Sequence, residues 1–225
     1  LQFAKHFMAE GWEVTTLYAN HNADKGGSLF AKYKIDGLDF IEIKAPYYSG
    51  NGLARMMSIW TFAWRIFRHS KDFERPDVIL HNIHPPFDYP IVWAAKKIGC
   101  KYIAEAWDLW PEDFVTTGLI SGRNPLMRIA YQIEKHCYYY ADDIVFTILG
   151  GKARLVEKGW TKDVGGKIDI SRVHYINNGV DLEQFDRDVL LYPRKDADIN
   201  RKDIFKIVYL GSLNVANNVQ TLVEA

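Results

Sequence analysis

The sequence predicts an α/β domain, with a parallel sheet covered by helices on both faces. Short β-branched and aromatic runs alternate with longer helical patterns along most of the chain, which is typical of parallel strands joined by crossover helices. The chain has 225 residues, of which 48% are hydrophobic and 14% aromatic, so it can bury a sizeable core. Its 28 basic and 28 acidic residues cancel, so no net charge attracts nucleic acid.

The elements near the start of the chain are a helix, a strand and a hairpin. Helical spacing of apolar residues runs from Leu1 to Glu10-Gly11, and residues 13–18 are predicted as a strand. Because a helix that leads into a strand implies an earlier strand, we expect the domain to lack its first strand. Strands at 31–35 and 38–43 flank Asp36-Gly37, a good hairpin signal.

The following elements alternate regularly between helix and strand. Helices are predicted at 52–69, 89–98, 125–140 and 152–158, and strands at 77–80, 101–105, 143–146 and 172–176. This is a Rossmann-like order, with helices on both faces of the sheet.

The last quarter of the chain differs in composition. Asn178-Gly179 is a strong turn signal, which by itself favours a surface hairpin. Residues 186–203 carry many charges of both signs and are predicted as a solvated linker. Residues 204–210 are strongly β-branched and aromatic, and a helical pattern starts at 216. We therefore predict a first domain over 1–185, a linker over 186–203, and the first strand and helix of a truncated second domain over 204–225.

The sequence argues against a disulfide scaffold, a metal site, secretion and a membrane span. Cys100 and Cys137 are far apart and lack ligand spacing, which favours reduced thiols and predicts no metal site. No signal peptide and no run of about 18 apolar residues is present, so we expect a cytoplasmic protein.

The carboxyl ends of the predicted strands mark the expected binding rim, because ligands of open α/β sheets bind there. His84 precedes Pro85-Pro86, which hold its loop extended, and it is a candidate substrate contact, although a lone histidine is more often structural. Gly150 and Gly151 resemble a glycine-rich entry to a helix, where free amides favour anions. Turn chemistry alone explains these glycines about as well.

The stretch AEAWDLWPED is the richest in chemistry. Carboxylates bind sugar hydroxyls and can act as bases, while indole faces stack on the apolar faces of pyranose rings. We therefore predict carbohydrate binding here, with packing and helix capping as the structural alternative. The candidate residues are Glu105, Trp107, Asp108, Trp110 and Glu112.

The predicted helix at 52–69 has a basic arc. Arg55, Arg65 and Arg68 share one side at helical spacing, whereas Trp60 and Trp64 take the other, and no acid occurs from 53 to 71. The helix is predicted to cover the sheet; the alternative is a basic and aromatic surface that contacts anionic lipid.

The segments NNGVDLEQF and KIVYLGSLNVANNVQTLVEA resemble the interdomain crossing and first βα unit of the family 4 glycosyltransferases of the GT-B fold. The segments RPDVILHNIHPP, KYIAEAWDLWPED and ADDIVFTILGGKARLVEKG follow in the order of the acceptor domain of that family, and are most similar to bacterial enzymes that build surface polysaccharide. The resemblance implies a retaining transfer from a nucleotide-sugar to a glycan or polyprenyl-linked acceptor, without metal or cofactor. It also makes Asp108 the candidate acceptor-side base.

The resemblance also assigns candidate donor-binding residues. Asn178 and Gly179 lie in the crossing motif, while Ser212 and Asn217 stand where the family commonly has Arg and Lys. Hydroxyl and amide groups donate hydrogen bonds but supply no positive charge. Because the donor site would come mainly from the absent domain, this fragment alone is predicted to be inactive. A sugar-nucleotide epimerase of the same fold and a noncatalytic sugar-binding module stay open as alternatives.

Overall fold

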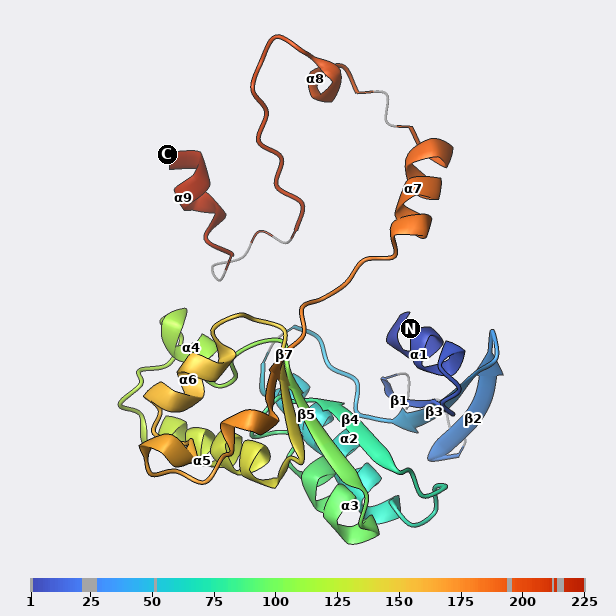
Figure 1. The fold of residues 1–225 in the computed structure, drawn as a ribbon, viewed down its shortest axis with the longest axis vertical. Coiled ribbons are helices and arrows are strands. Elements are labelled where there is room, and N and C mark those ends of the chain that lie inside the picture. The colour runs from blue at the N-terminus through green and yellow to red at the C-terminus, as the bar shows by residue number, and fades with distance from the viewer. Residues whose placement is uncertain are drawn as a thin grey trace. The chain divides into compact units, whose positions relative to one another are not determined.

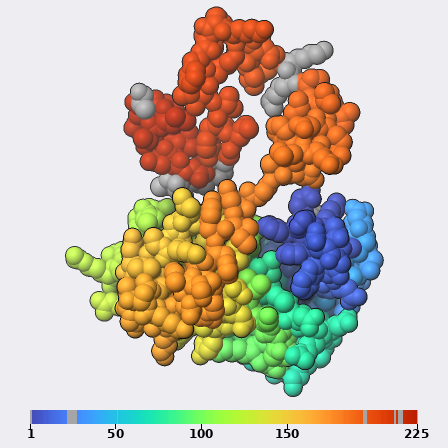
Figure 2. Space-filling model, viewed as in Figure 1, coloured from blue at the N-terminus to red at the C-terminus, as the bar shows by residue number. Residues whose placement is uncertain are grey.

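The computed structural model describes residues 2–21, 28–50, 52–193, 196–211, 213 and 217–224. The chain divides into two compact units, Leu1–Asn177 and Asn178–Ala225. In the first unit, α1 and β1 to β3 gather at one end, coloured blue in Figure 2, and α5 to β7 lie at the other.

The first unit begins with helix α1 (Gln2–Ala9) and a small mixed sheet. Its strands β1 (Thr15–Asn20), β3 (Leu38–Lys44) and β2 (Phe30–Ile35) lie in the order β1-β3-β2. β1 runs parallel to β3, and β2 pairs antiparallel with it. Asp36 and Gly37 have φ angles of 51° and 81°, the positive values of a two-residue hairpin turn, so the predicted hairpin is confirmed.

The second sheet is parallel throughout and contains β4 (Val78–Asn82), β5 (Lys101–Ala106), β6 (Asp143–Phe146) and β7 (Val173–Tyr175), in that order. Four helices connect these strands or lead into them: α2 (Leu53–His69), α3 (Pro90–Ile98), α5 (Pro125–Tyr140) and α6 (Gly151–Glu157) (Figure 1). The predicted class, α/β with a Rossmann-like parallel sheet, is confirmed.

The core lies between this sheet and its helices. Strand side chains pack against apolar side chains of α3, α5 and α6, as the nearly continuous apolar strands predict. Its fully buried members include Val92, Ala104, Tyr138, Ile144, Phe146 and Leu155. Cys137 of α5 is 1% exposed, Cys100 before β5 is half-buried, and both thiols are free.

A buried ion network joins α5 and α6 to the short helix α4 (Glu112–Thr116). The guanidinium of Arg154 donates to Glu112 at 2.7 Å and to Glu134 at 3.1 Å. Burial opposes ionisation of Glu112, yet hydrogen bonds from Arg154 and Lys158 lower its pKa to about 2. For Glu134, burial outweighs the attraction of Arg154 and raises the pKa to about 7.

The second unit contains α7 (Leu182–Leu191), α8 (Ala197–Asn200) and α9 (Val219–Glu224). Residues 186–203, which are predicted as a solvated linker, hold most of α7 and all of α8. Asp181 caps α7 through Gln184 N, and Asp196 caps α8. The compact first unit ends at Asn177, and the domain boundary at 185 stays a prediction.

The predicted strand at 204–210 is not formed. These residues are irregular, and Phe205 and Leu210 are 92% and 90% exposed. A strand needs a neighbour to satisfy its backbone groups, and no strand lies in the described part of this unit. The helix predicted from 216 is present as α9.

Candidate functional site

A histidine and aspartate cluster lies at the carboxyl end of β4. His81, near the end of the strand, has Nε2 at 3.2 Å from Asp88 Oδ2 and Nδ1 at 2.8 Å from the Tyr102 hydroxyl. The backbone N–H of His84 donates to the same Asp88 oxygen, and His84 Nδ1 lies 3.7 Å from it. The Asp88 carboxylate therefore fixes the loop that carries His84.

The Asp88 carboxylate stays ionised although it is 3% exposed. Burial alone would raise its pKa, but the attraction of His81 and hydrogen bonds from His81 and His84 lower the pKa below its ordinary value. Asp88 Oδ1 and Asn82 Nδ2 are buried and have no hydrogen-bond partner in the described part of the chain. Both are polar atoms at the carboxyl end of β4 that a ligand or backbone group can satisfy.

Glu105 extends this polar group onto β5. It lies opposite Asn82 in the parallel register and is 7% exposed. Burial raises the pKa of Glu105, and the polar groups of Trp107 and Asn82 nearby partly offset this rise. A buried carboxyl group with a perturbed pKa at the end of a strand is a candidate ligand contact.

The loop after β5 carries exposed and half-buried aromatic side chains. Trp107 is 48% exposed and Asp108 is exposed, whereas Trp110 is half-buried. The Trp110 ring lies edge-on to His84, with ring centres 5.7 Å apart, and edge-on to Phe114 at 4.8 Å. The structure therefore brings the predicted residues His84 and Trp110 together across two loops.

Glu112 points into a different environment from the other residues of this stretch. Its Oε2 atom lies 2.7 Å from Arg154 and 3.0 Å from Lys158. An acceptor hydroxyl would have to compete with these two cations, so acceptor binding by Glu112 stays a prediction without geometric support.

The glycines after β6 have different environments. Gly151 begins α6, and a Cβ atom there would lie 2.1 Å from the Phe146 ring, whereas a Cβ at Gly150 would meet nothing within 4 Å. Close packing on Phe146 is therefore sufficient to require glycine at 151, and anion binding by either residue stays a prediction.

The remaining predicted donor residues are Asn178, Gly179, Asn217 and Ser212. Asn178, Gly179 and Asn217 belong to the second unit. Ser212 lies outside the described residues. Their roles stay predictions.

Sequence reasoning missed the contacts of His81, and it missed Tyr102 and Asp88. The signal available was Asp88 four residues after His84, but the contact with Tyr102 depends on the pairing of β4 with β5. Within the described ranges, no group of three or more histidine, cysteine or acidic residues could hold a metal ion.

One side of α2 carries exposed apolar side chains. Leu53, Met57, Trp60 and Trp64 are exposed by 83%, 68%, 41% and 40%. Arg68 is exposed too, but Arg55 is half-buried and the guanidinium of half-buried Arg65 donates to Lys44 O. Of the predicted lipid-contacting residues, Trp60, Trp64 and Arg68 are therefore the accessible ones.

Comparison with protein families agrees with this fold. The model of Glycosyltransferase Family 4 matches residues 1–184, which include the first unit and both loops of the rim. The chain belongs to glycosyltransferase family 4. Among curated proteins, no sequence is similar enough to count as a match. A family 4 glycosyltransferase transfers a sugar, and it would bind a nucleotide-sugar donor and a glycan acceptor.

Proposed function

We propose that residues 1–177 form the acceptor-binding part of a retaining glycosyltransferase. The enzyme would transfer a sugar from a nucleotide-sugar to a glycan or polyprenyl-linked acceptor in bacterial surface polysaccharide synthesis, such as capsule synthesis. The observation that carries this proposal is the rim at the ends of β4 and β5, where His84, Glu105, Trp107, Asp108 and Trp110 supply carboxylate, imidazole and indole groups. This combination suits the hydroxyl groups and apolar faces of a sugar.

The roles follow from accessibility. Asp108 is exposed and can orient an acceptor hydroxyl or take its proton. His84 is held by Asp88 and stands beside Trp110, so it can position the same acceptor. The leaving phosphate of the donor would assist on the same face of the sugar, with no metal ion or cofactor required.

The exposed side chains of α2 support the proposal that the acceptor is held at a membrane. Indole rings favour the boundary between headgroups and acyl chains, and cations favour anionic headgroups. Among the described residues, no helix is both long enough and apolar enough to cross a membrane. We propose peripheral contact at the cytoplasmic face of the plasma membrane through Trp60, Trp64 and Arg68.

The test combines binding with transfer. A short polyprenyl diphosphate-sugar is titrated into this chain while the fluorescence of Trp107 and Trp110 is followed, with Trp107→Phe and Trp110→Phe variants to assign the signal. We expect acceptor binding but no sugar transfer by residues 1–225 alone. Product formation from the donor alone by the complete enzyme would instead indicate an epimerase, and acceptor binding without transfer by the complete enzyme would indicate a noncatalytic module.

A further inference from the structure

Arg154 of α6 is a buried cation that binds carboxylates on two other helices. Its side chain is 10% exposed, and its guanidinium donates to Glu112 Oε2 of α4 at 2.7 Å. The same guanidinium donates to both side-chain oxygens of Glu134 on α5, at 3.1 and 3.2 Å. Arg154 therefore joins α4, α5 and α6, which lie at one end of the first unit (Figure 1).

The Glu134 side of this contact is fixed by the core. The Glu134 side chain is fully buried, on the side of α5 that also buries Ala130 and Cys137. Leu155, which follows Arg154 in α6, is fully buried in the same core. The guanidinium is therefore held in place by two helices that pack on the parallel sheet.

The Glu112 side of the contact belongs to a helix with little burial of its own. α4 has five residues, none of them buried, and its N-cap residue Pro111 makes no side-chain cap hydrogen bond. Helices this short are not stable alone in water. The backbone bonds of α4 are local, such as Asp113 N to Leu109 O at 3.1 Å, so they close the turn without attaching it to the unit. The contact of Glu112 with Arg154 provides this attachment.

The position of α4 also sets the loop that carries Asp108. Residues 107–111 connect the end of β5 directly to Glu112, so both ends of this loop are attached to regular elements. The Trp110 ring lies edge-on to Phe114 of α4, with ring centres 4.8 Å apart. A shift of α4 would therefore displace Asp108 and Trp110 together.

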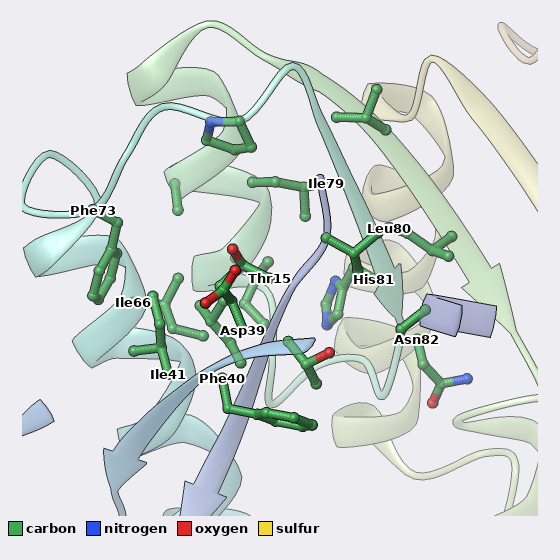
Figure 3. A pocket seen from close by; sticks show the side chains of 18 of the residues that line it. Thr15, Asp39, Phe40, Ile41, Ile66, Phe73, Ile79, Leu80, His81 and Asn82 are labelled. Atoms are coloured by element: carbon green, nitrogen blue, oxygen red, sulfur yellow. The ribbon is translucent and has the colours of Figure 1, made fainter. Parts of the chain in front are cut away.

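The loop after β4 has a separate anchor. Asp88 holds this loop through the His84 backbone N–H and through His81, and Figure 3 shows His81 and Asn82 near the end of β4. The two loops meet where the ring centres of Trp110 and His84 are 5.7 Å apart. One buried carboxylate thus fixes one side of the rim, and the buried guanidinium is in the position to fix the other.

Stability alone does not account for a buried cation at this place. Removal of charged groups from water is costly, and apolar side chains of similar volume often stabilise a protein as much as a buried ion group or more. Arg154 Nε is also buried without a hydrogen-bond partner among the described residues. A guanidinium does, however, supply a rigid planar set of donors, which fixes two carboxylates relative to each other. This geometry suits a positioning role.

We propose that Arg154 is a positioning residue of the acceptor site, which acts through Glu112 to hold the loop 107–111, with Asp108 and Trp110, at the rim. This inference rests on the proposed function, in which that loop binds the acceptor. Because Arg154 is buried, it acts without contact with either substrate. Small displacements matter here, since a misplacement of about 1 Å can lower a rate by about 10²-fold.

The kinetic test is Arg154→Lys in the complete enzyme, with a polyprenyl diphosphate-sugar as acceptor and a nucleotide-sugar as donor. Lysine keeps the buried charge, but one ammonium group cannot reproduce the fork that bridges two carboxylates. We expect the acceptor KM to rise by about tenfold while the donor KM changes by less than about twofold. A lower kcat with both KM values unchanged indicates only a loss of folded enzyme and rejects the positioning role.

Arg172→Lys is the matched control. Arg172 donates to Ala141 O at 2.7 Å, close to the amino ends of β6 and β7 and away from the loops of the rim. This substitution also exchanges a guanidinium for an ammonium group, and it should leave both KM values unchanged. An equal rise of the acceptor KM in Arg172→Lys would show a general effect of arginine loss and would overturn the proposal.

The structural test does not depend on catalysis. Arg154→Lys should speed amide hydrogen exchange at 113 and 114 of α4 by about fivefold or more, whereas exchange at 83 and 87, in the loop held by Asp88, should not change. Glu112→Gln leaves the pair of Arg154 and Glu134 in the core, so it should have the same effect and replaces Arg154→Lys if that variant does not fold. Unchanged exchange at 113 and 114 in a folded variant rejects the proposal.

The double variant shows whether Arg154 acts through Glu112. If it does, the two substitutions together raise the acceptor KM no more than the stronger one alone, and additive effects contradict the proposal. Failure of the proposed function gives a different result, because Asp108→Asn and Trp110→Phe then leave transfer unchanged. Failure of the positioning role alone leaves those two variants impaired and the acceptor KM of Arg154→Lys normal.

Discussion

His81 Nε2 lies 3.2 Å from Asp88 Oδ2, and the side chains are 10% and 4% exposed. Because the same oxygen accepts the His84 backbone N–H, one buried carboxylate ties the end of β4 to the loop that carries the candidate acceptor contact. Substitution of Asp88 should therefore affect both the stability of the first unit and the position of the loop that carries His84.

Replacement of Asp88 should destabilise the first unit strongly. Asp88→Asn replaces the buried carboxylate that lies 3.2 Å from His81 Nε2 and accepts the His84 backbone N–H, and loss of one partner of a buried pair costs about 3 kcal/mol. The free energy of unfolding is measured by urea titration. Asp143→Asn is the matched control, because Asp143 pairs with His174 at 2.8 Å with both side chains 45% exposed, and its loss should cost no more than about 1 kcal/mol. Equal effects of the two substitutions would contradict a special role for Asp88.

Glu134 should make stability fall as pH rises. Its pKa is about 7 in the folded unit against 4.5 for an unperturbed glutamate, so between these values the folded state holds a proton that the unfolded state has lost. The Glu134 contribution to the free energy of unfolding therefore decreases from pH 4.5 to 7. Glu134→Gln, compared with the wild type at about pH 5 and about pH 7.5, should remove this part of the pH dependence. An unchanged slope would show that Arg154 keeps Glu134 ionised throughout this range.

The two glycines after β6 should respond differently to alanine. Gly151→Ala places a methyl group 2.1 Å from the Phe146 ring and should cost about 1–3 kcal/mol through overpacking. Gly150→Ala meets nothing within 4 Å and should change stability by no more than about 0.5 kcal/mol. Thermal unfolding followed by circular dichroism measures both. A larger loss at 150 than at 151 would show that Gly150 has a conformational role.

Asp108→Asn should preserve the fold, because the side chain is exposed. In the complete enzyme, donor binding should persist while turnover falls by roughly 10²- to 10⁴-fold if Asp108 is the base. A much smaller loss indicates that it only positions the acceptor. Initial rates with a saturating nucleotide-sugar measure this, with Asp113→Asn as a control from the same stretch of chain. Full activity of Asp108→Asn would leave His84 as the better candidate.

Vesicle binding should depend on the outer face of α2. Trp60→Ser together with Trp64→Ser should reduce sedimentation with vesicles that contain anionic lipid, because these indoles are exposed. Arg68→Gln should weaken binding at low salt by about 1 kcal/mol. Arg65→Gln is the comparison, since its guanidinium is already bonded to Lys44 O. A greater effect of Arg65 than of Trp60 and Trp64 would favour the basic arc as the lipid contact.

Sequence patterns predicted best the elements whose ends carry local signals such as a capping residue. α5 occupies the predicted range of 125–140, and Asn124 caps it by accepting from Leu126 N at 2.9 Å. α7 was missed because its charges were interpreted as a linker, although Asp181 is a capping residue. The strand predicted at 204–210 failed because strand formation depends on a neighbour that local sequence does not reveal.

Candidate residues that directly follow a predicted strand could be located from the sequence, whereas contacts between separate elements could not. His84, Asp108 and the two tryptophans follow strands that the sequence located, so their position near the carboxyl ends could be predicted. The contact of His81 with Tyr102 needs the register of β4 on β5, and the contact with Asp88 needs the path of the intervening loop. Glu112 could be recognised as a helix-start acid, but its partner Arg154 lies on α6.

The two free thiols are buried to different extents, so their reactivity can report how far the first unit unfolds. Burial raises the pKa of both Cys100 and Cys137, so neither is a ready nucleophile in the folded unit. Cys100 is half-buried, next to the left-handed Gly99 cap of α3, whereas Cys137 faces the core from α5. A thiol reagent should therefore label Cys100 through small local fluctuations and Cys137 only after α5 separates from the sheet. The ratio of the two labelling rates then distinguishes partial from global unfolding in the unmodified chain.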